Sequence, residues 1–291
     1  MRSLLATTGL GAIAAVMAAV PASAETVIST AVTTPQSTSA SGDIRISSTG
    51  SVKPTTGVGV TLNTNNYLRN EGTIQITGAN NSAGAVANAG VSGEITNSGT
   101  IAIDESFTPT DSDNDGDLDG AFAQGSGRFA IHALGAFTGN VTNSGTITVE
   151  GNQSGGIVVD GSLAGNLANS GGISVLGNDS YGIKAGNVSG NVTIPKGTIS
   201  VQGGNSVGVA LNGDIGGALV IQGTVQTTGY RYTTPPSDPS KLDADDLLQG
   251  GSAVVIGGDV AGGILFDKKP ADNSTTDDDE DDDGVPDAQE T

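Results

Sequence analysis

The sequence of 291 residues contains no cysteine and no tryptophan, and it has only five phenylalanines and four tyrosines. The absence of cysteine excludes disulfide bonds. The scarcity of aromatic rings excludes a thick globular core, although a thin aliphatic core remains available. Basic residues are also few, because 11 Lys and Arg stand against 31 Asp and Glu for a net charge of −20. Nucleic acids and anionic membrane surfaces attract Lys and Arg, so we expect neither as a partner.

The N-terminus has the features of a secretory signal peptide over residues 1–24. Met1 and Arg2 form a short positive start, residues 4–20 are an apolar run, and the Ala-Ser-Ala string at 22–24 is a small-residue cleavage site. Cleavage there would leave Glu25 as the first residue of an exported protein. The alternative is an uncleaved membrane anchor, because the apolar run approaches the length of a short spanning helix.

Glycine is abundant, with 46 residues, and much of it belongs to a repeat. The string ITNSGTI at 95–101 returns as VTNSGTI at 141–147 and as LANSGGI at 167–173. With the looser copies, the repeat glycines stand at positions 72, 99, 145, 171, 197 and 223, so the steps are 26 or 27 residues except for one of 46. A fixed period of this size is typical of a solenoid, and the alternation of apolar residues predicts three short strands per turn. We therefore predict an all-β fold, a parallel β-helix (β-solenoid), over residues 67–266.

Stacked turns should align equivalent side chains. One expected aliphatic column contains Ile74, Ile101, Ile147, Ile173, Ile199 and Val225, and a second contains Ala85, Ile157, Ile183 and Val209. An asparagine stands two residues before the repeat glycine at positions 70, 97, 143 and 169, which predicts a ladder of stacked carboxamides. At the equivalent positions of the next two repeats, Pro195 and Ile221 are expected to replace the asparagine. We expect the glycine of each corner to adopt a positive φ.

Three other segments depart from the repeat. Residues 25–66 are rich in Thr and Ser and are expected to cap the end of the solenoid, because terminal repeats must protect their strand edges. Acidic insertions are expected at 107–124 and 230–249, both leaving the coil between the same two strands. Residues 267–291 are expected to be an acidic disordered tail or the start of a third insertion.

Two acidic strings share the pattern D-x-D-x-D-G-x-x-D. The candidate ligands are Asp111, Asp113, Asp115 and Asp119 in the first string, and Asp279, Asp281, Asp283, Asp287 and Glu290 in the second. Oxygens at alternate positions converge around a hard cation, and the glycine permits a sharp bend, so the spacing predicts Ca²⁺ as the bound ion. The alternative is a pair of solvated acidic loops that keep the chain soluble.

The signal peptide, the N-S-G-T-I repeats and the lack of cysteine together resemble the passenger region of Gram-negative autotransporters. The resemblance covers residues 1 to about 266 and implies a right-handed parallel β-helix that reaches the cell surface, the outer membrane or the medium through the periplasm. It also implies an outer-membrane β-barrel translocator in cis. No run of amphipathic strands for such a barrel is visible, so we expect a fragment of a longer chain or a separate secretion unit.

The functional expectation is a non-enzymatic surface protein that acts as an adhesin or a rigid stalk, with a host or surface glycan or protein as its ligand. The alternative is a carbohydrate-active β-helix enzyme, a lyase or a hydrolase. We expect no catalytic residue, because the only histidine, His132, is expected in a polar turn and Lys184 is expected to stand alone on its strand. A binding or catalytic cleft would instead show aromatic and charged residues aligned over three or more turns. The outward positions are expected to be mostly Thr, Ser, Asn and Gln.

Overall fold

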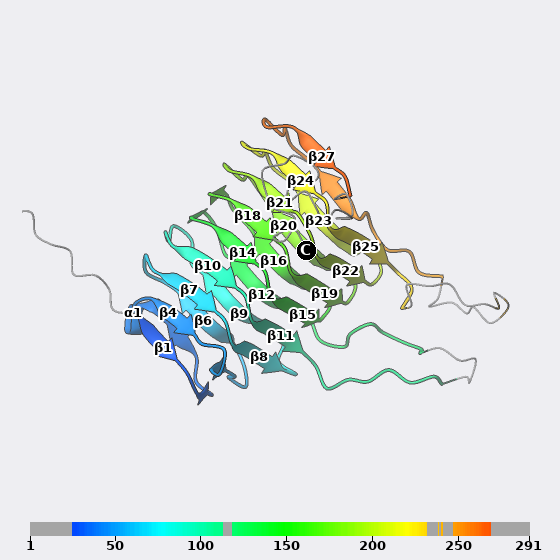
Figure 1. Ribbon diagram of the computed structural model, residues 1–291. Helices are drawn as coiled ribbons and strands as arrows, with labels where there is room; N and C mark the ends of the chain where they lie inside the picture. Colours follow the sequence, from blue (N-terminus) through cyan, green and yellow to red (C-terminus); the bar gives the residue numbers. More distant parts are fainter. Residues whose placement is uncertain (1–24, 113–117, 232–237, 239, 241–246, 269–291) are drawn as a thin grey trace, which may run out of the picture.

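The protein is a parallel β-solenoid. A computed structural model describes residues 25–112, 118–231, 238, 240 and 247–268, so the predicted signal peptide and most of the acidic tail lie outside the described residues. The chain winds through three long parallel sheets, A, B and C, and each turn adds one strand to each sheet (Figure 1). The prediction of an all-β fold with three strands per turn is confirmed.

Each sheet is ordered along the molecule as the chain is ordered in sequence. Sheet A contains β1 (Thr26–Ile28), β4 (Ile44–Ile46), β7 (Tyr67–Asn70), β10 (Glu94–Asn97), β14 (Val141–Asn143), β18 (Leu167–Asn169), β21 (Val192–Ile194), β24 (Leu219–Ile221) and β27 (Ile264–Phe266). Sheet B contains β2 (Ala31–Val32), β5 (Ser51–Val52), β8 (Thr73–Thr77), β11 (Thr100–Asp104), β15 (Thr146–Glu150), β19 (Gly172–Leu176), β22 (Thr198–Gln202) and β25 (Thr224–Thr228). Sheet C contains β3 (Gln36–Ser37), β6 (Val58–Leu62), β9 (Ser82–Ala87), β12 (Arg128–Ala133), β16 (Gly155–Val159), β20 (Tyr181–Ala185), β23 (Val207–Leu211) and β26 (Val254–Ile256).

Minor elements complete the fold. The strands β13 (Phe137–Thr138) and β17 (Leu163–Ala164) form a small separate sheet. The segment expected as an N-terminal cap contributes the first strands of all three long sheets and contains the single-turn helix α1 (Thr38–Ser41). Within the described ranges, no helix is long and apolar enough to span a membrane. Both insertions connect a strand of sheet B to a strand of sheet C: the first joins β11 to β12, and the second joins β25 to β26.

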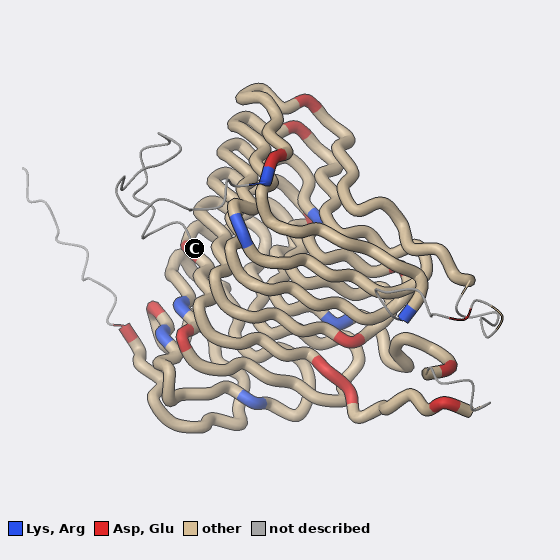
Figure 2. Tube along the Cα trace, turned by 45° about the vertical axis from the view of Figure 1, so that its right-hand side comes forward, with Lys and Arg blue, Asp and Glu red and all other residues tan. Residues whose placement is uncertain are grey.

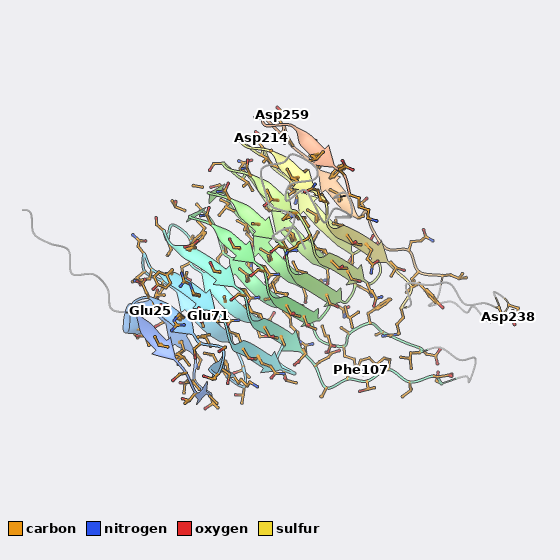
Figure 3. All side chains as sticks on the ribbon, in the orientation of Figure 1. Glu25, Glu71, Phe107, Asp214, Asp238 and Asp259 are labelled. Atoms are coloured by element: carbon orange, nitrogen blue, oxygen red, sulfur yellow. The ribbon has the colours of Figure 1, made fainter. Side chains whose placement is uncertain are left out.

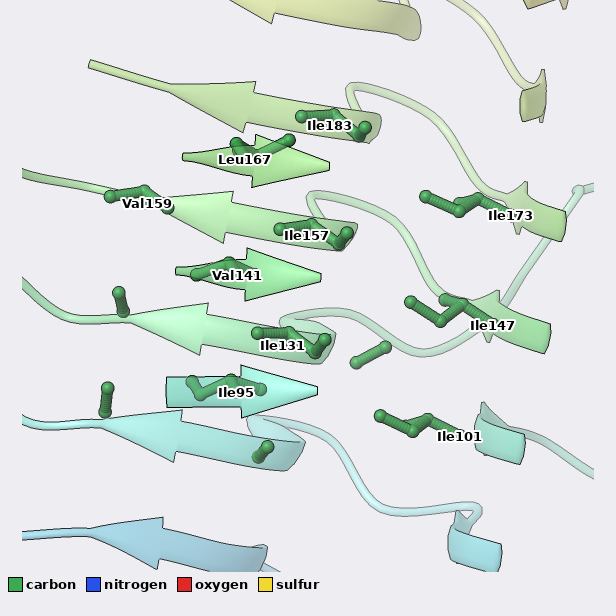
Figure 4. Close-up of a cluster of buried hydrophobic side chains, with 14 of the residues drawn as sticks. Ile95, Ile101, Ile131, Val141, Ile147, Ile157, Val159, Leu167, Ile173 and Ile183 are labelled. Carbon is green, nitrogen blue, oxygen red and sulfur yellow. The ribbon is translucent and has the colours of Figure 1, made fainter. Parts of the chain in front are cut away.

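The core consists of aliphatic columns that run along the solenoid (Figure 4). The sheet B column of isoleucines pairs in register as expected, and its members from Ile74 to Ile199 are at most 2% exposed. The sheet C column is also confirmed. It gains one member, because Ile131 pairs with Ala85 on one side and with Ile157 on the other. The expected column lacked this residue because the first insertion interrupts the repeat frame.

The asparagine ladder lies buried at the corner between sheets A and B. The Nδ2 atoms of Asn70, Asn97 and Asn143 each donate to the Oδ1 atom of the next asparagine at 2.7 Å, and all four asparagines are fully buried. Asn70 Oδ1, at the end of the ladder, is the one buried side-chain polar atom without a partner in the described part of the chain. These hydrogen bonds therefore fix the orientation of each carboxamide against the neighbouring turns of the ladder.

Two expectations about this corner are wrong. The position after Asn169 belongs to Ile194 and not to Pro195, because β21 pairs with β24 with Ile194 opposite Ile221. The ladder glycines also do not have a positive φ, with the exception of Gly197 at 86°. A Cβ added at Gly99 would overlap the carbonyl oxygen of Gly72 in the neighbouring turn. The corner therefore requires glycine for the close approach of stacked backbones and not for left-handed geometry.

A second buried ladder, made of serines, lies at the corner between sheets B and C. The backbone amide of Ser154 donates to Ser180 Oγ at 3.1 Å, and that of Ser180 donates to Ser206 Oγ at 3.0 Å. All three serines are fully buried. The amide of Arg128 donates to Ser154 Oγ at 2.9 Å and extends the series by one turn. Both corners are thus fixed by one polar residue type repeated from turn to turn.

Candidate functional site

The outer faces of sheets B and C differ in chemistry. Outward residues of sheet B are mostly small or polar, and the column through its centre reads Gln75, Ala102, Thr148, Ser174, Ser200 and Gln226. Sheet C instead presents two adjacent outer columns, Ala83, Phe129, Gly155, Tyr181 and Val207 in one and Val86, His132, Val158, Lys184 and Ala210 in the other. The expectation of polar outward positions therefore holds for sheet B and is wrong for sheet C.

A break in strand alternation produces the outer face of sheet C. In β16, Gly155 and Val158 face outward, whereas Gly156, Ile157 and Val159 face the core, so two consecutive residues point inward. A Cβ added at Gly156 would overlap the γ-methyl group of Ile173 from sheet B. Glycine at position 156 therefore leaves room for the isoleucine column of sheet B. Strict two-residue alternation from Ile157 would point Gly155 inward, whereas it faces outward.

Charged and aromatic side chains from three consecutive turns meet on this face. Asp160 Oδ2 lies 2.7 Å from His132 Nε2, and Asp160 Oδ1 lies 3.8 Å from Lys184 Nζ. The Lys184 ammonium also lies 5.3 Å from the centre of the Tyr181 ring, and the Phe129 and His132 rings lie 4.2 Å apart. Asp160 is thus the centre of a cluster that spans β12, β16 and β20.

A depression of about 140 Å³ lies between these side chains. Phe129 and Tyr181 flank it, and Gln153, Ser154 and Asp179 contribute from the adjacent corner. Gly155 stands between the two aromatic residues in the same column, and Val158, which is 2% exposed, leans into the space above it. The depression therefore has an apolar floor, two aromatic walls and a charged rim.

The structure corrects the placement of the two basic residues. His132 lies within β12, opposite Val86 and Val158, and its side chain is 13% exposed, so it is a strand residue and not a turn residue. Lys184 does not stand alone, because Asp160 and Tyr181 contact it. A signal for this cluster was present in the sequence: 52 residues, twice the repeat period, separate Phe129 from Tyr181 and also His132 from Lys184.

A second polar cluster closes the base of the first insertion. Arg128, which is 2% exposed, donates from Nη1 to Glu105 Oε2 at 2.6 Å, from Nε to Ala79 O at 3.0 Å and also to the carbonyl oxygen of Glu150. Glu105 also accepts from the amides of Gln124 at 2.7 Å and Gly125 at 2.9 Å. Burial acts to raise the pKa of Glu105, but these hydrogen bonds and the Arg128 charge outweigh it and hold the pKa below its ordinary value.

The hollow beside this ion pair has a volume of about 330 Å³, and the stems of the first insertion line it. Its most buried charged groups, Arg128 and Glu105, already satisfy each other. Phe107, on the outgoing stem, lies beyond the end of the sheet B strands (Figure 3). We therefore assign this cluster a structural role, which is to hold the two stems of the insertion together.

The two insertions contact each other although they are far apart in sequence. Arg231, just after β25, donates to the carbonyl oxygens of Leu118 at 3.1 Å, Gly120 at 3.1 Å and Ala121 at 3.0 Å. Its guanidinium also lies 5.1 Å from the centre of the Phe122 ring. The loops that leave the solenoid between sheets B and C are therefore joined on its outside.

The predicted calcium ligands are only partly within the described residues. Asp111 and Asp119 lie in the first insertion, where Ser112 donates to Asp119 Oδ2 from its amide and, at 2.6 Å, from its hydroxyl. The other candidates, Asp113, Asp115, Asp279, Asp281, Asp283, Asp287 and Glu290, lie outside the described residues. Among the side chains that the structure describes, no three His, Cys, Asp or Glu residues are grouped to hold a metal ion. Calcium binding stays a prediction.

Charged side chains are sparse along the turns and leave most of the coil surface uncharged (Figure 2). Glu25 and Glu71 lie at the N-terminal end of the solenoid (Figure 3). Arg45 lies 3.5 Å from Glu25 and 2.8 Å from Glu71, a partly exposed arrangement that stabilises the first turns only weakly. The cluster around Asp160 contains charged and aromatic residues that line a depression on a sheet face. Comparison of the chain with known protein families, with curated proteins and with solved structures gave no match.

Proposed function

We propose that this chain is an exported, non-enzymatic surface protein of the autotransporter-passenger type, in which the solenoid is a rigid stalk and the outer face of sheet C is adhesive. The observation that carries the proposal is the alignment of Phe129, His132, Asp160, Tyr181 and Lys184 over three turns of that face. Aromatic and charged residues gathered around a concavity are typical of binding sites.

The construction of the coil supports the role of a stalk. Aliphatic columns run along the coil, and buried polar ladders connect the turns from Asn70 to Ser206, so the solenoid resists bending and local rearrangement. A signal peptide and an outer-membrane β-barrel translocator in cis would bring the stalk to the cell surface. The ligand would be a glycan or a protein of a host or of another surface.

Two measurements on the full chain test the proposal. Protease digestion of intact producing cells should remove the protein, as expected for surface exposure. Beads coated with the protein should adhere to host cells, and the variant Phe129→Ala/Tyr181→Ala/Lys184→Ala should lose most of this adhesion. The matched sheet B variant Gln75→Ala/Thr148→Ala/Ser174→Ala should adhere like the wild type. Equal adhesion of the two triple variants would exclude sheet C as the adhesive face.

The His132–Asp160 contact favours a second candidate, a carbohydrate-active enzyme. A carboxylate that lies 2.7 Å from an imidazole can orient it for proton transfer. An enzyme would release shorter or unsaturated products from a polysaccharide, and Asp160→Asn would abolish this release. Incubation of the full chain with a panel of bacterial and host polysaccharides, followed by chromatography of the products, separates the two candidates.

A further inference from the structure

We propose that the depression on sheet C binds one pyranose ring of a neutral sugar, either free at the end of a glycan or within its chain. This inference rests on the proposed function, because it names the ligand class of the adhesive face. Four properties of the depression support a sugar as the ligand: its walls, its hydrogen-bonding groups, its charge balance and its size.

The walls and floor suit a flat ligand with an apolar face. Phe129 and Tyr181 lie in the same outer column two turns apart, a separation of about 10 Å at the usual strand spacing. Gly155 occupies the turn between them, and even a Cβ at this position would overlap Val158 Cγ2. Glycine at this position therefore leaves room for a Val158 methyl group between the two rings. The C–H face of a sugar ring can pack against the aromatic rings and the Val158 methyl groups.

The rim offers both donors and acceptors. The Asp160 carboxylate accepts from His132 on one oxygen, and the nearest charged partner of its second oxygen among the described residues is the Lys184 ammonium at 3.8 Å. Asp160 is 43% exposed, so acceptor capacity remains for ligand hydroxyl groups. Lys184 carries three donors and is 33% exposed. Adjacent hydroxyl groups of one sugar ring can donate to Asp160 and accept from Lys184.

Charge and size favour a neutral ring over other ligands. Asp160 and Asp179 would repel an anion, whereas Lys184 would repel a cation. The rim groups Asp160 and Lys184 can pair with the hydroxyl groups of a sugar, whereas an apolar aromatic side chain offers them no hydrogen bond. The volume of about 140 Å³ is below the roughly 300–1,000 Å³ of sites for drug-sized ligands. The occupant is therefore one ring and not an extended buried chain.

The test uses the full chain with isotopically labelled valine methyl groups. A panel of methyl hexopyranosides is titrated and followed by NMR, together with acetyl-phenylalanine amide as an aromatic probe. We expect at least one glycoside to shift the Val158 methyl resonances saturably and to leave those of Val220, on the outside of sheet A, unchanged. Tyr181→Ala and Asp160→Asn should each weaken this binding about tenfold or more, the loss expected for a removed aromatic or charged contact.

Tyr181→Phe should retain binding because it keeps the ring, and Ser174→Ala on sheet B is the matched control. Each variant must keep the wild-type far-UV CD spectrum; if Tyr181→Ala does not fold, Asp160→Asn and Lys184→Met carry the test. If no glycoside shifts Val158, or if only the aromatic probe does, the sugar site is wrong. Adhesion through sheet C with no glycoside effect would overturn this inference and leave the proposed function standing. Glycoside binding at Val158 without surface exposure or adhesion would overturn the proposed function alone.

Discussion

The A–B and B–C corners flank sheet B, and each contains a buried ladder of one polar residue type. At the A–B corner the asparagine ladder runs without an insertion from Asn70 to Asn169. At the B–C corner the serine ladder is shorter, both insertions leave the coil, and the depression on sheet C opens beside it. Both corners bury repeated polar side chains, but in the described part of the chain only the B–C corner carries insertions, and the charged and aromatic cluster of sheet C lies beside it.

At the first insertion, the solenoid varies one corner while the other stays uniform in the same turns. Every turn must hold its register against its neighbours, and in the turns from Asn70 to Asn169, which include the first insertion, the ladder at the A–B corner supplies this constraint. The B–C corner then tolerates a loop of about 20 added residues, because the entropic cost of closing a loop grows only slowly with its length. Where it does so, Arg128 and Glu105 close the base of the loop.

The largest effect should come from Arg128, on the B–C side. Arg128→Met leaves the Glu105 carboxylate, which is 7% exposed, without its cation, and we expect a loss of about 3–5 kcal/mol in the free energy of unfolding. Urea denaturation followed by circular dichroism measures this loss. The double variant Arg128→Met/Glu105→Gln should recover part of it, and Arg231→Met, at a more exposed arginine, should cost less than about 1 kcal/mol. A single-variant loss below that of Arg231→Met would contradict the structural role.

The next effect should appear at the A–B corner. Asn97→Ala removes both ladder hydrogen bonds of this side chain and leaves Asn143 Oδ1 buried without a partner, whereas Asn70 Nδ2 keeps its bond to Thr100 O at 3.1 Å, so we expect a loss of about 2–3 kcal/mol. The control is Asn166→Ala, because Asn166 makes similar contacts between turns but is exposed, and it should cost less than about 1 kcal/mol. Similar losses for the two variants would show that burial of the ladder does not matter.

Ser180→Ala should have a smaller effect at the B–C corner. The variant removes the acceptor for the Ser154 amide and one hydroxyl donor, and we expect a loss of about 1–2 kcal/mol. Ser174→Ala on the outer face of sheet B is the matched control and should be nearly neutral. If Ser180→Ala destabilises the protein more than Asn97→Ala, the A–B corner is not the stronger constraint.

The smallest effect should be the pH dependence of the unfolding free energy, to which the B–C corner contributes through Glu105 and the asparagine ladder does not. The pKa of Glu105 is lower in the folded protein than its ordinary value, so its contribution to stability is complete above the unfolded pKa of about 4.3 and is lost as pH falls through the folded pKa. Unfolding free energies measured from pH 6 to pH 3 should fall less steeply below about pH 4.3 in Glu105→Gln than in the wild type. The Asn97→Ala variant should keep the wild-type slope, because the asparagine ladder does not titrate. Identical slopes for wild type and Glu105→Gln would rule out a linked Glu105 proton.

The repeat predicted much of the fold. A fixed period with apolar alternation identifies the strands, the parallel stacking and the columns, because these depend only on equivalent positions in neighbouring turns. The isoleucines from Ile74 to Ile199 and the four ladder asparagines were predicted for this reason, and the register confirms them. Positions predicted from the repeat period were missed where residues were inserted, at Ile131, and were wrong where the spacing between repeats shifted, at Ile194.

The sequence alone therefore determined the repeating architecture, whereas the tertiary structure decided the site. Asp160, His132 and Lys184 belong to three different turns, and the contacts among them depend on side-chain direction and on the exact register between turns. The first insertion obscured the register between neighbouring turns in the sequence. The direction of the side chains also departs from alternation, because Gly156 and Ile157 both face the core. Periodicity reports which residues are equivalent, but only packing reports which residues meet.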